Sequence, residues 1–294
     1  MKLLAVLVIY MPDDSDYNQI VSNIKRYING IDALIVWDNT PSLDHKDVLR
    51  IHLKELMDDQ EFMKLIFMSS GCNCGLSYAY NRAIEYAKQN GYTHLLTMDQ
   101  DSKWESFDKY RSFAEIYYKR EPLAIIGPSI NEDEQSDILK NVPNIINSGA
   151  IIPIALFNKI GGFCERFLVD GVDVEICYRA QRYGIPVYKV KGYGHLVQHF
   201  GNMTFFYFNG RLWHCTNYNT FRLKGIVRNH MLIVRNYPEQ SDTKERLRNV
   251  YLKQYTIAIL LKEKHKLSKL WSIYSSLIKG ILTTKSLDST YSKA

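Results

Sequence analysis

Apolar runs alternate with helical patterns along the first third of the chain. The run at 3–10 is apolar almost throughout, which is typical of a parallel strand buried on both faces. Further strands are predicted at 33–37, 64–68 and 94–98, each followed by polar or turn-forming residues. Apolar residues at helical spacing predict helices at 17–28, 48–57 and 78–89. This alternation predicts an α/β fold built of βαβ units around a mostly parallel sheet flanked by helices.

The second half is less regular. Apolar runs predict strands at 123–126, 145–153 and 187–190, and a helix at 172–183 that Gly184 and Pro186 end. A stretch rich in His and aromatic residues follows, from His195 to His230. We therefore expect an α/β domain over residues 1–236, divided at residue 102, and an amphipathic helical tail over 237–294.

The positive charge of the chain is concentrated in that tail. From Lys244 onward there are 11 Lys or Arg and 3 acids, a net charge of +8. The rest of the chain has 26 basic and 28 acidic residues, a net of −2. Such asymmetry indicates an anionic partner, either a membrane surface or nucleic acid. Nothing in the first half favours nucleic acid, and we expect none.

Cysteine usage and hydropathy bear on location. The five cysteines lack the paired spacing of a metal site, and their odd number favours reduced thiols in the cytosol. The run after Lys2 is short and has no small-residue cleavage site, so we interpret it as a strand. No apolar run approaches the ~18–20 residues of a membrane span. We expect a cytoplasmic protein, peripheral on the inner face of the cell membrane.

Polar residues follow the predicted strands at the points where these end. They are Asp38, Asn39, Asn73, Gly75, Asp99 and Asp101. In open parallel sheets, ligands bind beyond the carboxyl ends of the strands. We therefore expect these residues to line a single site.

Asp99-Gln100-Asp101 is the sharpest of these features. Two carboxylates at i and i+2, at the end of a buried strand, can bind a hard cation such as Mn²⁺ or Mg²⁺ that also holds a diphosphate. The alternative is a solvated, Asp-rich turn that caps the next helix. The position of the pair and the polar residues around it favour the metal site.

Four motifs occur in order at suitable intervals: Tyr10-Met11-Pro12, Asp38-Asn39-Thr40, Asn73-Cys74-Gly75-Leu76 and Asp99-Gln100-Asp101-Ser102. Together they resemble the donor-binding half of family 2 glycosyltransferases, which have the GT-A fold. The Asp-Gln-Asp-Ser form is similar to the bacterial rhamnosyltransferase-like branch. The resemblance continues through 161–184 to His199-Phe200-Gly201, and more weakly to Arg228, and so covers about residues 1–236.

The resemblance implies a donor site in residues 1–102 for a nucleotide diphosphate sugar, with dTDP and UDP both open. The chain at Tyr10 and Pro12 and the carboxylate of Asp38 would hold the nucleoside, with Asn39 beside them. Asn73 and Gly75 would allow the donor to approach the backbone closely, although a plain turn into the next helix would also use these residues.

The same resemblance implies how the diphosphate is held. Asp99 would contact the ribose and the metal-bound diphosphate, and Asp101 would ligate the metal. His199 would complete the metal site or touch the diphosphate; its alternative is a packed, hydrogen-bonded side chain. Arg228, together with Arg222, would neutralise the leaving diphosphate.

The acceptor half, residues 103–236, contains the candidate base. Asp173 aligns with the second carboxylate of the family's Glu-Asp pair and would deprotonate the acceptor hydroxyl. Val172 replaces the Glu, so Asp170 and Glu175 stay open as the base. We favour Asp170 as an acceptor contact and Glu175 as the residue that orients Arg179 on the acceptor side; a simple i,i+4 helix pair is the alternative for Glu175.

The tail combines apolar residues at helical spacing with Lys, Arg, Trp and Tyr. Such a helix suits the interface of an anionic bilayer. Its apolar stripe fits equally well against the α/β domain or against a second subunit in a homodimer, and both can hold at once.

The function that these features predict is an inverting, metal-dependent transfer of a hexose or deoxyhexose. The acceptor would be a lipid-linked saccharide in surface polysaccharide synthesis, and rhamnose follows from the branch resemblance alone. A nucleotidyltransferase is disfavoured because Tyr10-Met11-Pro12 replaces a Gly-rich phosphate loop. A catalytically silent protein that binds nucleotide sugars is disfavoured by the presence of Asp99, Asp101 and Asp173.

Overall fold

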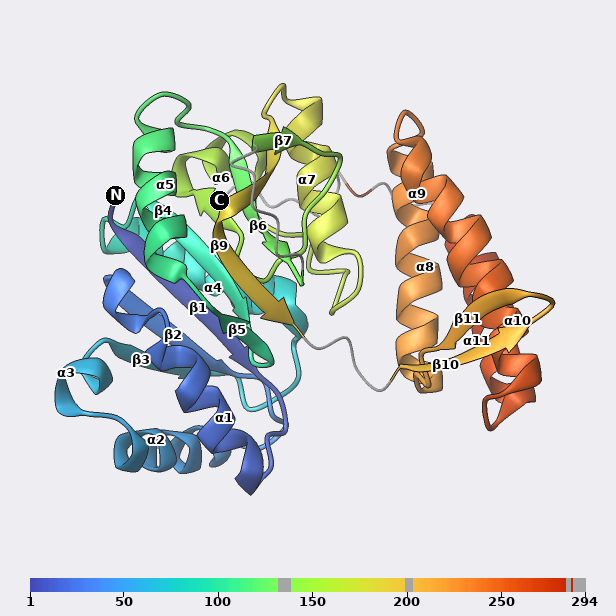
Figure 1. Ribbon diagram of the computed structural model, residues 1–294, viewed down its shortest axis with the longest axis horizontal. Coiled ribbons are helices and arrows are strands. Elements are labelled where there is room, and N and C mark those ends of the chain that lie inside the picture. Colours follow the sequence, from blue (N-terminus) through green and yellow to red (C-terminus); the bar gives the residue numbers. More distant parts are fainter. Residues whose placement is uncertain (132–138, 199–202, 284–286, 288–294) are drawn as a thin grey trace.

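A mixed sheet of nine strands lies at the centre of the N-terminal part of the chain (Figure 1). The computed structural model describes residues 1–131, 139–198, 203–283 and 287. Within these residues the strand order is β3-β2-β1-β4-β8-β6-β9-β5, and β7 pairs with β9. The predicted α/β fold is confirmed.

The parallel half of the sheet follows the hydrophobic pattern closely. It contains β1 (Leu3–Ile9), β2 (Ala33–Asp38), β3 (Leu65–Ser69) and β4 (His94–Asp99), all paired in parallel. Every residue of β1 is buried, because helices cover both faces of the sheet. The helices between these strands are α1 (Asp14–Lys25), η1 (Ile28–Gly30), α2 (His45–Leu56), α3 (Asp59–Phe62) and α4 (Gly75–Gln89).

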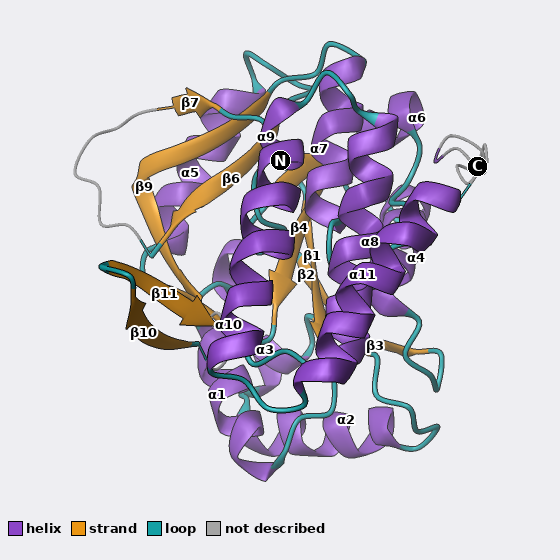
Figure 2. Cartoon of the chain, turned by 90° about the vertical axis from the view of Figure 1, so that its right-hand side faces the viewer, coloured by secondary structure: helices purple, strands orange, loops and turns teal. Residues whose placement is uncertain are grey.

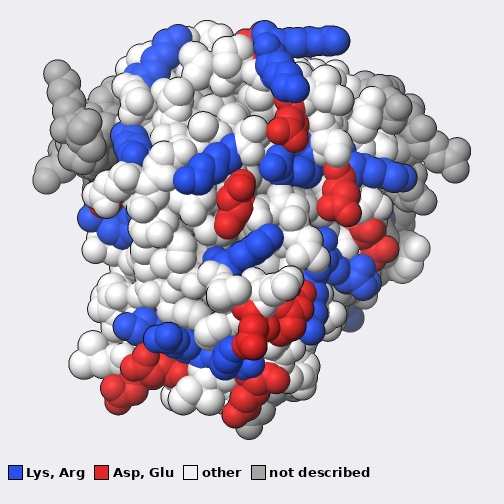
Figure 3. All heavy atoms as spheres, turned by 90° about the vertical axis from the view of Figure 1, so that its left-hand side faces the viewer, with Lys and Arg blue, Asp and Glu red and all other residues white. Residues whose placement is uncertain are grey.

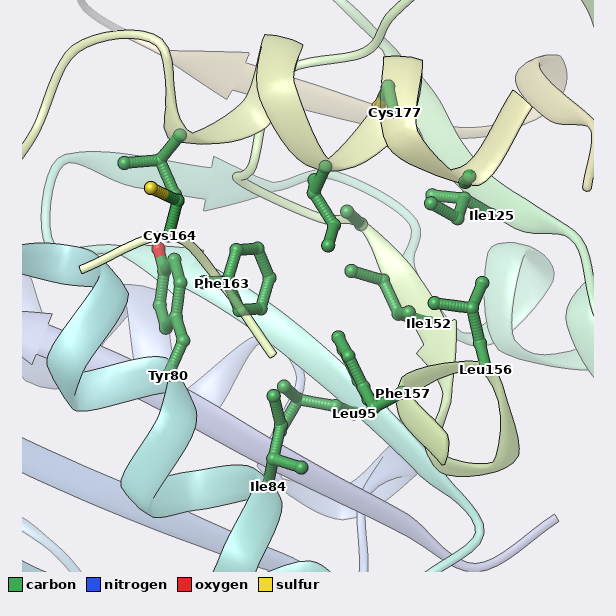
Figure 4. Packing of buried hydrophobic residues seen from close by; sticks show 14 of the residues in the cluster. Tyr80, Ile84, Leu95, Ile125, Ile152, Leu156, Phe157, Phe163, Cys164 and Cys177 are labelled. Atoms are coloured by element: carbon green, nitrogen blue, oxygen red, sulfur yellow. The ribbon is translucent and has the colours of Figure 1, made fainter. Parts of the chain in front are cut away.

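Alternate residues of the strands enter two hydrophobic cores. Leu3 and Ala5 pack with α1, α2 and α5 (Phe107–Tyr118) on one face. Leu4 and Val6 pack on the other face with α4, α6 (Ile154–Ile160) and α7 (Val172–Arg182). Figure 4 shows the second core, where residues of α4 and α6 meet the strands below α7. The two-sided burial explains why β1 is uniformly apolar.

The second half of the sheet differs from the predictions in its limits. Its strands are β5 (Ser102–Trp104), β6 (Ile125–Ile130), β7 (Leu139–Asn141), β8 (Ile151–Pro153) and β9 (Val187–Gln198). Residues 145–150, predicted as strand, form a loop because Gly149 adopts a φ of +80° and the chain bonds instead to Thr97. β9 runs eight residues beyond its predicted end and passes a bend at Gly192 and Gly194, where φ is positive.

The C-terminal part contains a helical unit beside the sheet (Figures 1 and 2). It consists of α8 (Thr220–Asn236), α9 (Ser241–Arg246), η2 (Leu247–Gln254), α10 (Tyr255–Leu261) and α11 (Lys266–Leu282). A hairpin of β10 (Thr204–Phe208) and β11 (Arg211–Cys215) leads into it. A third core joins α8 to η2, α10 and α11 through residues such as Val227, Tyr251 and Ile273. The apolar stripe predicted for the tail therefore packs in large part on α8.

Among the described residues, no helix combines the length and the apolar character that crossing a bilayer requires.

Candidate active site

A cavity of about 680 Å³ opens at the carboxyl ends of β1, β2 and β4. This volume is within the usual range for a small-molecule site. The donor half contributes side chains that the sequence had placed together at this edge of the sheet: Tyr10, Asn39, Asn73, Asp99 and Asp101. The parallel register explains the grouping, because β1 and β4 pair from Leu3–His94 to Val8–Asp99.

Basic side chains line the opposite wall of the cavity. Arg222, Lys224 and Arg228 come from α8, and Lys279 comes from α11. Arg228 also donates to the carbonyl of Arg166 at 3.1 Å, which holds it against the loop before α7. A cavity lined by both carboxylates and cations suits a polyanionic ligand that binds together with a metal ion.

Asp99 and Gln198 form the inner end of the cavity. Gln198 Nε2 donates to Asp99 Oδ2 at 2.8 Å. Burial, reinforced by the negative charge of Asp101, raises the pKa of Asp99 to about 7, although the Gln198 hydrogen bond opposes the shift. Gln198 is only 9% exposed, and its Oε1 has no hydrogen-bond partner among the described residues. A buried acceptor oxygen beside two carboxylates is a donor set that fits Mn²⁺ or Mg²⁺.

The rest of the predicted metal site is not described. His199, the predicted third ligand, lies outside the described residues. Within the residues that are described, no group of three or more His, Cys, Asp or Glu side chains is placed to hold a metal. The fit to a cation therefore depends on the oxygens of Asp99, Asp101 and Gln198.

The turn before α4 is held by side-chain amides. Asn39 Nδ2 donates to Asn73 Oδ1 at 2.9 Å, and the backbone N–H of Cys74 donates to Asn39 Oδ1 at 3.0 Å. Gly75 has a φ of +82°, and a Cβ at this position would lie 2.6 Å from the carbonyl oxygen of Leu168. Gly75 thus permits close contact with the loop that carries Asp170, a different reason from the predicted approach of the donor.

Asp38 supports the turn after β1 from within the core. It is fully buried and does not line the cavity. Its Oδ2 accepts from Nδ1 of His45 at 2.8 Å, and its Oδ1 accepts from the backbone of Thr40 at 3.0 Å. Thr40 in turn accepts from the N–H of Met11 at 3.0 Å. Asp38 therefore fixes the turn beneath Tyr10, while Pro12 lies beside this turn and outside the cavity lining.

The acceptor-side acids occupy different environments. Asp170 lines the cavity, 3.6 Å from Nε of Arg222. Burial raises the pKa of Asp170 to about 6, against the opposing charge of Arg222. Asp173 lies in the first turn of α7, where its Oδ1 accepts from the N–H of Val174 at 2.9 Å. Burial raises the pKa of Asp173 as well, and its charge acts on Asp170 and Asp99.

Glu175 points into the core and is not part of the cavity lining. It is fully buried, and its carboxylate accepts from Nε and Nη2 of Arg179 at 3.0 and 2.6 Å. The hydroxyl of Tyr237 donates to the same carboxylate at 2.6 Å. The predicted pair with Arg179 is present within α7. The hydrogen bond from Tyr237 joins α7 to the end of α8.

Sequence reasoning missed Gln198 and Lys279. Gln198 directly precedes His199, so its position next to a predicted ligand was the available signal. Lys279 had no such signal, because only the packing of α11 on α8 brings it to the cavity.

Comparison with known proteins confirms the predicted fold, because solved glycosyltransferases with the GT-A fold share it. A curated glycosyltransferase is also similar in sequence. The chain is similar to the dTDP-rhamnosyl transferase RfbF of Shigella flexneri, with 26% identity over 209 residues. That match spans 64% of this chain and 66% of the relative, just under two-thirds of its length. No family model matches the sequence.

Solved structures share the fold at low identity. The mannosyltransferase PcManGT of Pyrobaculum calidifontis, in complex with GDP-Man and Mn²⁺, has a TM-score of 0.59 at 12% identity, over 96% of this chain and 86% of its own. GalNAc-T7 with UDP, GalNAc and Mn²⁺ has a TM-score of 0.58 at 11% identity, over 97% of this chain and 56% of its own. TarS of S. aureus, residues 1–349, has a TM-score of 0.55 at 13% identity, over 96% and 81%.

Proposed function

We propose that the chain transfers a hexose or deoxyhexose from a nucleotide diphosphate sugar to an acceptor hydroxyl. The observation that carries the proposal is the cavity that joins Asp99 and Asp101 to the cationic wall of α8 and α11. The likeness to a dTDP-rhamnosyl transferase supports rhamnose and dTDP as the first donor to test.

The donor diphosphate lies between the two walls in this proposal. Arg222 and Arg228 bind its phosphate oxygens and stabilise the charge that grows as the bond to the sugar breaks. Tyr10 and Asn39, at the ends of β1 and β2, border the nucleoside. Gln198 holds Asp99 in position through its 2.8 Å hydrogen bond.

Asp99, Asp101 and the Oε1 of Gln198 would hold a divalent cation, with His199 as a further ligand. A Mn²⁺ or Mg²⁺ ion bound there supplies charge neutralisation of the leaving diphosphate. The Mn²⁺ in the complexes of PcManGT and GalNAc-T7 supports this part of the proposal.

The acceptor hydroxyl is deprotonated by Asp173 in this proposal, with Asp170 as its contact on the acceptor. Attack on the face opposite the diphosphate would invert the anomeric carbon. The raised pKa of both carboxyls suits a proton acceptor, because a general base works best when its pKa is near the working pH. Asp170 lines the cavity and so remains the alternative base.

We expect the acceptor to be a lipid-linked saccharide at the inner face of the membrane, in the synthesis of a surface polysaccharide. The basic C-terminal segment supports a membrane partner. This is also the basis for proposing a peripheral location on that surface.

The test is release of nucleotide from a panel of dTDP- and UDP-sugars, with and without Mn²⁺ or Mg²⁺. We expect metal-dependent hydrolysis of one donor, lost by at least about a hundredfold in Asp101→Asn. Asp47→Asn, an exposed acid on α2, is the matched control and should keep the wild-type rate. If the donor binds but no lipid-linked acceptor gives turnover, the chain is instead a catalytically silent binding protein.

The same assay with an acceptor distinguishes the two candidate bases. Asp173→Asn should lower transfer by about a hundredfold or more and leave donor binding intact. If Asp170→Asn gives that result and Asp173→Asn does not, Asp170 is the base.

A further inference from the structure

Helix α11 packs on α8 through its small residues. Ser272, Ser276 and Gly280 recur every four residues and are all buried. A Cβ at Gly280 would lie 2.8 Å from the Cβ of Met231 on α8, so the two helices approach closely there. Nη1 of Arg235 donates to the carbonyl of Gly280 at 2.8 Å and fixes this contact.

The opposite side of α11 carries its large apolar residues. They follow helical spacing and form what we call the α11 outer face: Leu267, Trp271, Tyr274, Ile278, Ile281 and Leu282. Leu267 is 86% exposed, Trp271 73% and Leu282 70%. A surface helix in water normally turns its larger apolar residues inward; α11 buries Ile273 in this way but leaves the residues of the outer face exposed. A contiguous exposed apolar stripe of this kind indicates an interaction surface.

The chain segment that contains this face carries mostly positive charge. Residues 247–283 contain Arg248 and six lysines, at positions 253, 262, 264, 266, 269 and 279. The one acid among these residues is Glu263, which is 5% exposed and binds Lys269 at 2.6 Å. By contrast, Figure 3 shows the other side of the molecule, where acidic and basic side chains are interspersed.

The helix that carries this face also lines the cavity. Ser276 and Lys279 of α11 are part of the cavity lining. Lys279 directly follows Ile278 of the outer face along the helix. A partner seated on the outer face would therefore be separated from the cavity by the width of one helix.

We propose that the α11 outer face docks onto an anionic lipid bilayer, with the helix parallel to the membrane surface. A Trp and a Tyr within an apolar stripe, with lysines beside it, match the interfacial region of a bilayer. A second copy of the chain fits less well, because pairing two outer faces brings lysines of like charge together. The evidence for docking is this surface alone. That docking brings a lipid-linked acceptor to the cavity rests on the proposed function.

The experiment is co-sedimentation of the full chain with vesicles of phosphatidylglycerol and phosphatidylethanolamine in equal parts. We expect binding that weakens with added salt and is weaker to vesicles of phosphatidylcholine than to the anionic vesicles, as electrostatic attraction requires. The double variant Leu267→Glu with Trp271→Glu should reduce the partition coefficient by at least about tenfold. Ile116→Glu, an exposed apolar residue on α5 and thus away from α11, is the matched control and should bind as the wild type does.

Donor hydrolysis in detergent-free buffer separates docking from catalysis. The double variant should keep the wild-type hydrolysis rate, which also shows that it is folded, and lose transfer to acceptors embedded in vesicles. Absent hydrolysis in every variant would count against the proposed function and leave docking intact. Docking is overturned if the wild type does not bind the vesicles, or if the double variant and Ile116→Glu bind them equally well. It is also overturned if sedimentation velocity shows that the face mediates dimerisation.

Discussion

Gln198 is held in the site by Asn131, which binds its backbone, and by Asp99, which binds its side chain. Asn131 binds both backbone groups of Gln198, accepting from its N–H at 3.0 Å and donating to its carbonyl at 2.8 Å. The end of β9 is thereby fixed, and the side chain is aimed at Asp99. The residue acts on Asp99 and offers a free acceptor to a bound cation.

Gln198→Ala should therefore lower the affinity for the metal ion as well as the rate. Loss of a residue that positions a metal ligand typically lowers affinity or activity by about 10–100-fold. We expect half-maximal activity to require about tenfold more Mn²⁺. Gln181→Ala is the control, since the side chain of Gln181, on α7, bonds among the described residues to main-chain carbonyls and to Gln240. An unchanged Mn²⁺ requirement in Gln198→Ala would contradict the assignment.

At the scale of elements, the contact between the α4 turn and the loop before α7 shapes the cavity. Gly75 lies in the left-handed region and meets the backbone of Leu168, whereas Gly91 has a φ of +68° and nothing within 4 Å of a Cβ. The two glycines share the left-handed conformation and differ in the space around them.

This pair gives a matched stability prediction. Gly91→Ala should cost about 1 kcal/mol, from left-handed strain alone. Gly75→Ala should cost roughly 2–4 kcal/mol, because overpacking adds to the same strain. Chemical denaturation of both variants measures the difference, and equal losses would show that the close approach to Leu168 is not a constraint.

The buried imidazole that joins α8 to η2 makes stability depend on pH. His230 Nδ1 donates to the carbonyl of Ile226 at 2.9 Å, and Nε2 accepts from the hydroxyl of Tyr251 at 3.2 Å. Burial lowers the pKa of His230 to about 4, below the value of 6.5 expected when the chain is unfolded. Below pH 6.5 His230 is protonated in the unfolded state but stays neutral in the folded state. The free energy of unfolding therefore falls as the pH is lowered from 6.5 to 4.

His230→Gln should remove this loss. The wild type should lose roughly 3 kcal/mol more than the variant between pH 6.5 and 4, since each pKa unit corresponds to 1.36 kcal/mol. Denaturation curves of both proteins at each pH measure the difference. Parallel pH profiles would mean that His230 is not held neutral in the folded state.

The sequence predicts the parallel strands well because their burial is local and two-sided. β1 is uniformly apolar and the interior of β4 is buried, and Asp99 and Asp101 lie at the predicted edge. β9 was predicted short because Gly192 and Gly194 interrupt its pattern, while pairing with β5 and β6 extends it. Glu175 was placed on the acceptor side because nothing local indicates that Tyr237, far along the chain, buries it.

At the scale of the whole molecule, the C-terminal helices do two things at once. α8 and α11 supply the cationic wall of the cavity, and α11 turns its large apolar residues away from it. This arrangement depends on packing between helices far apart in the sequence, so charge and hydropathy indicated an anionic partner but not the second wall of the site. The cavity is complete only when both parts of the chain are present.

The central claim is that this cavity binds a nucleoside diphosphate together with a divalent cation. Calorimetric titration of dTDP and UDP into the full chain, with and without Mn²⁺, tests it most directly. We predict one molecule of nucleotide bound per chain, with an affinity that Mn²⁺ raises by at least about tenfold in the wild type and does not raise in Asp101→Asn. Absence of binding to either nucleotide in the presence of Mn²⁺, or binding that is identical in Asp101→Asn, would contradict the account.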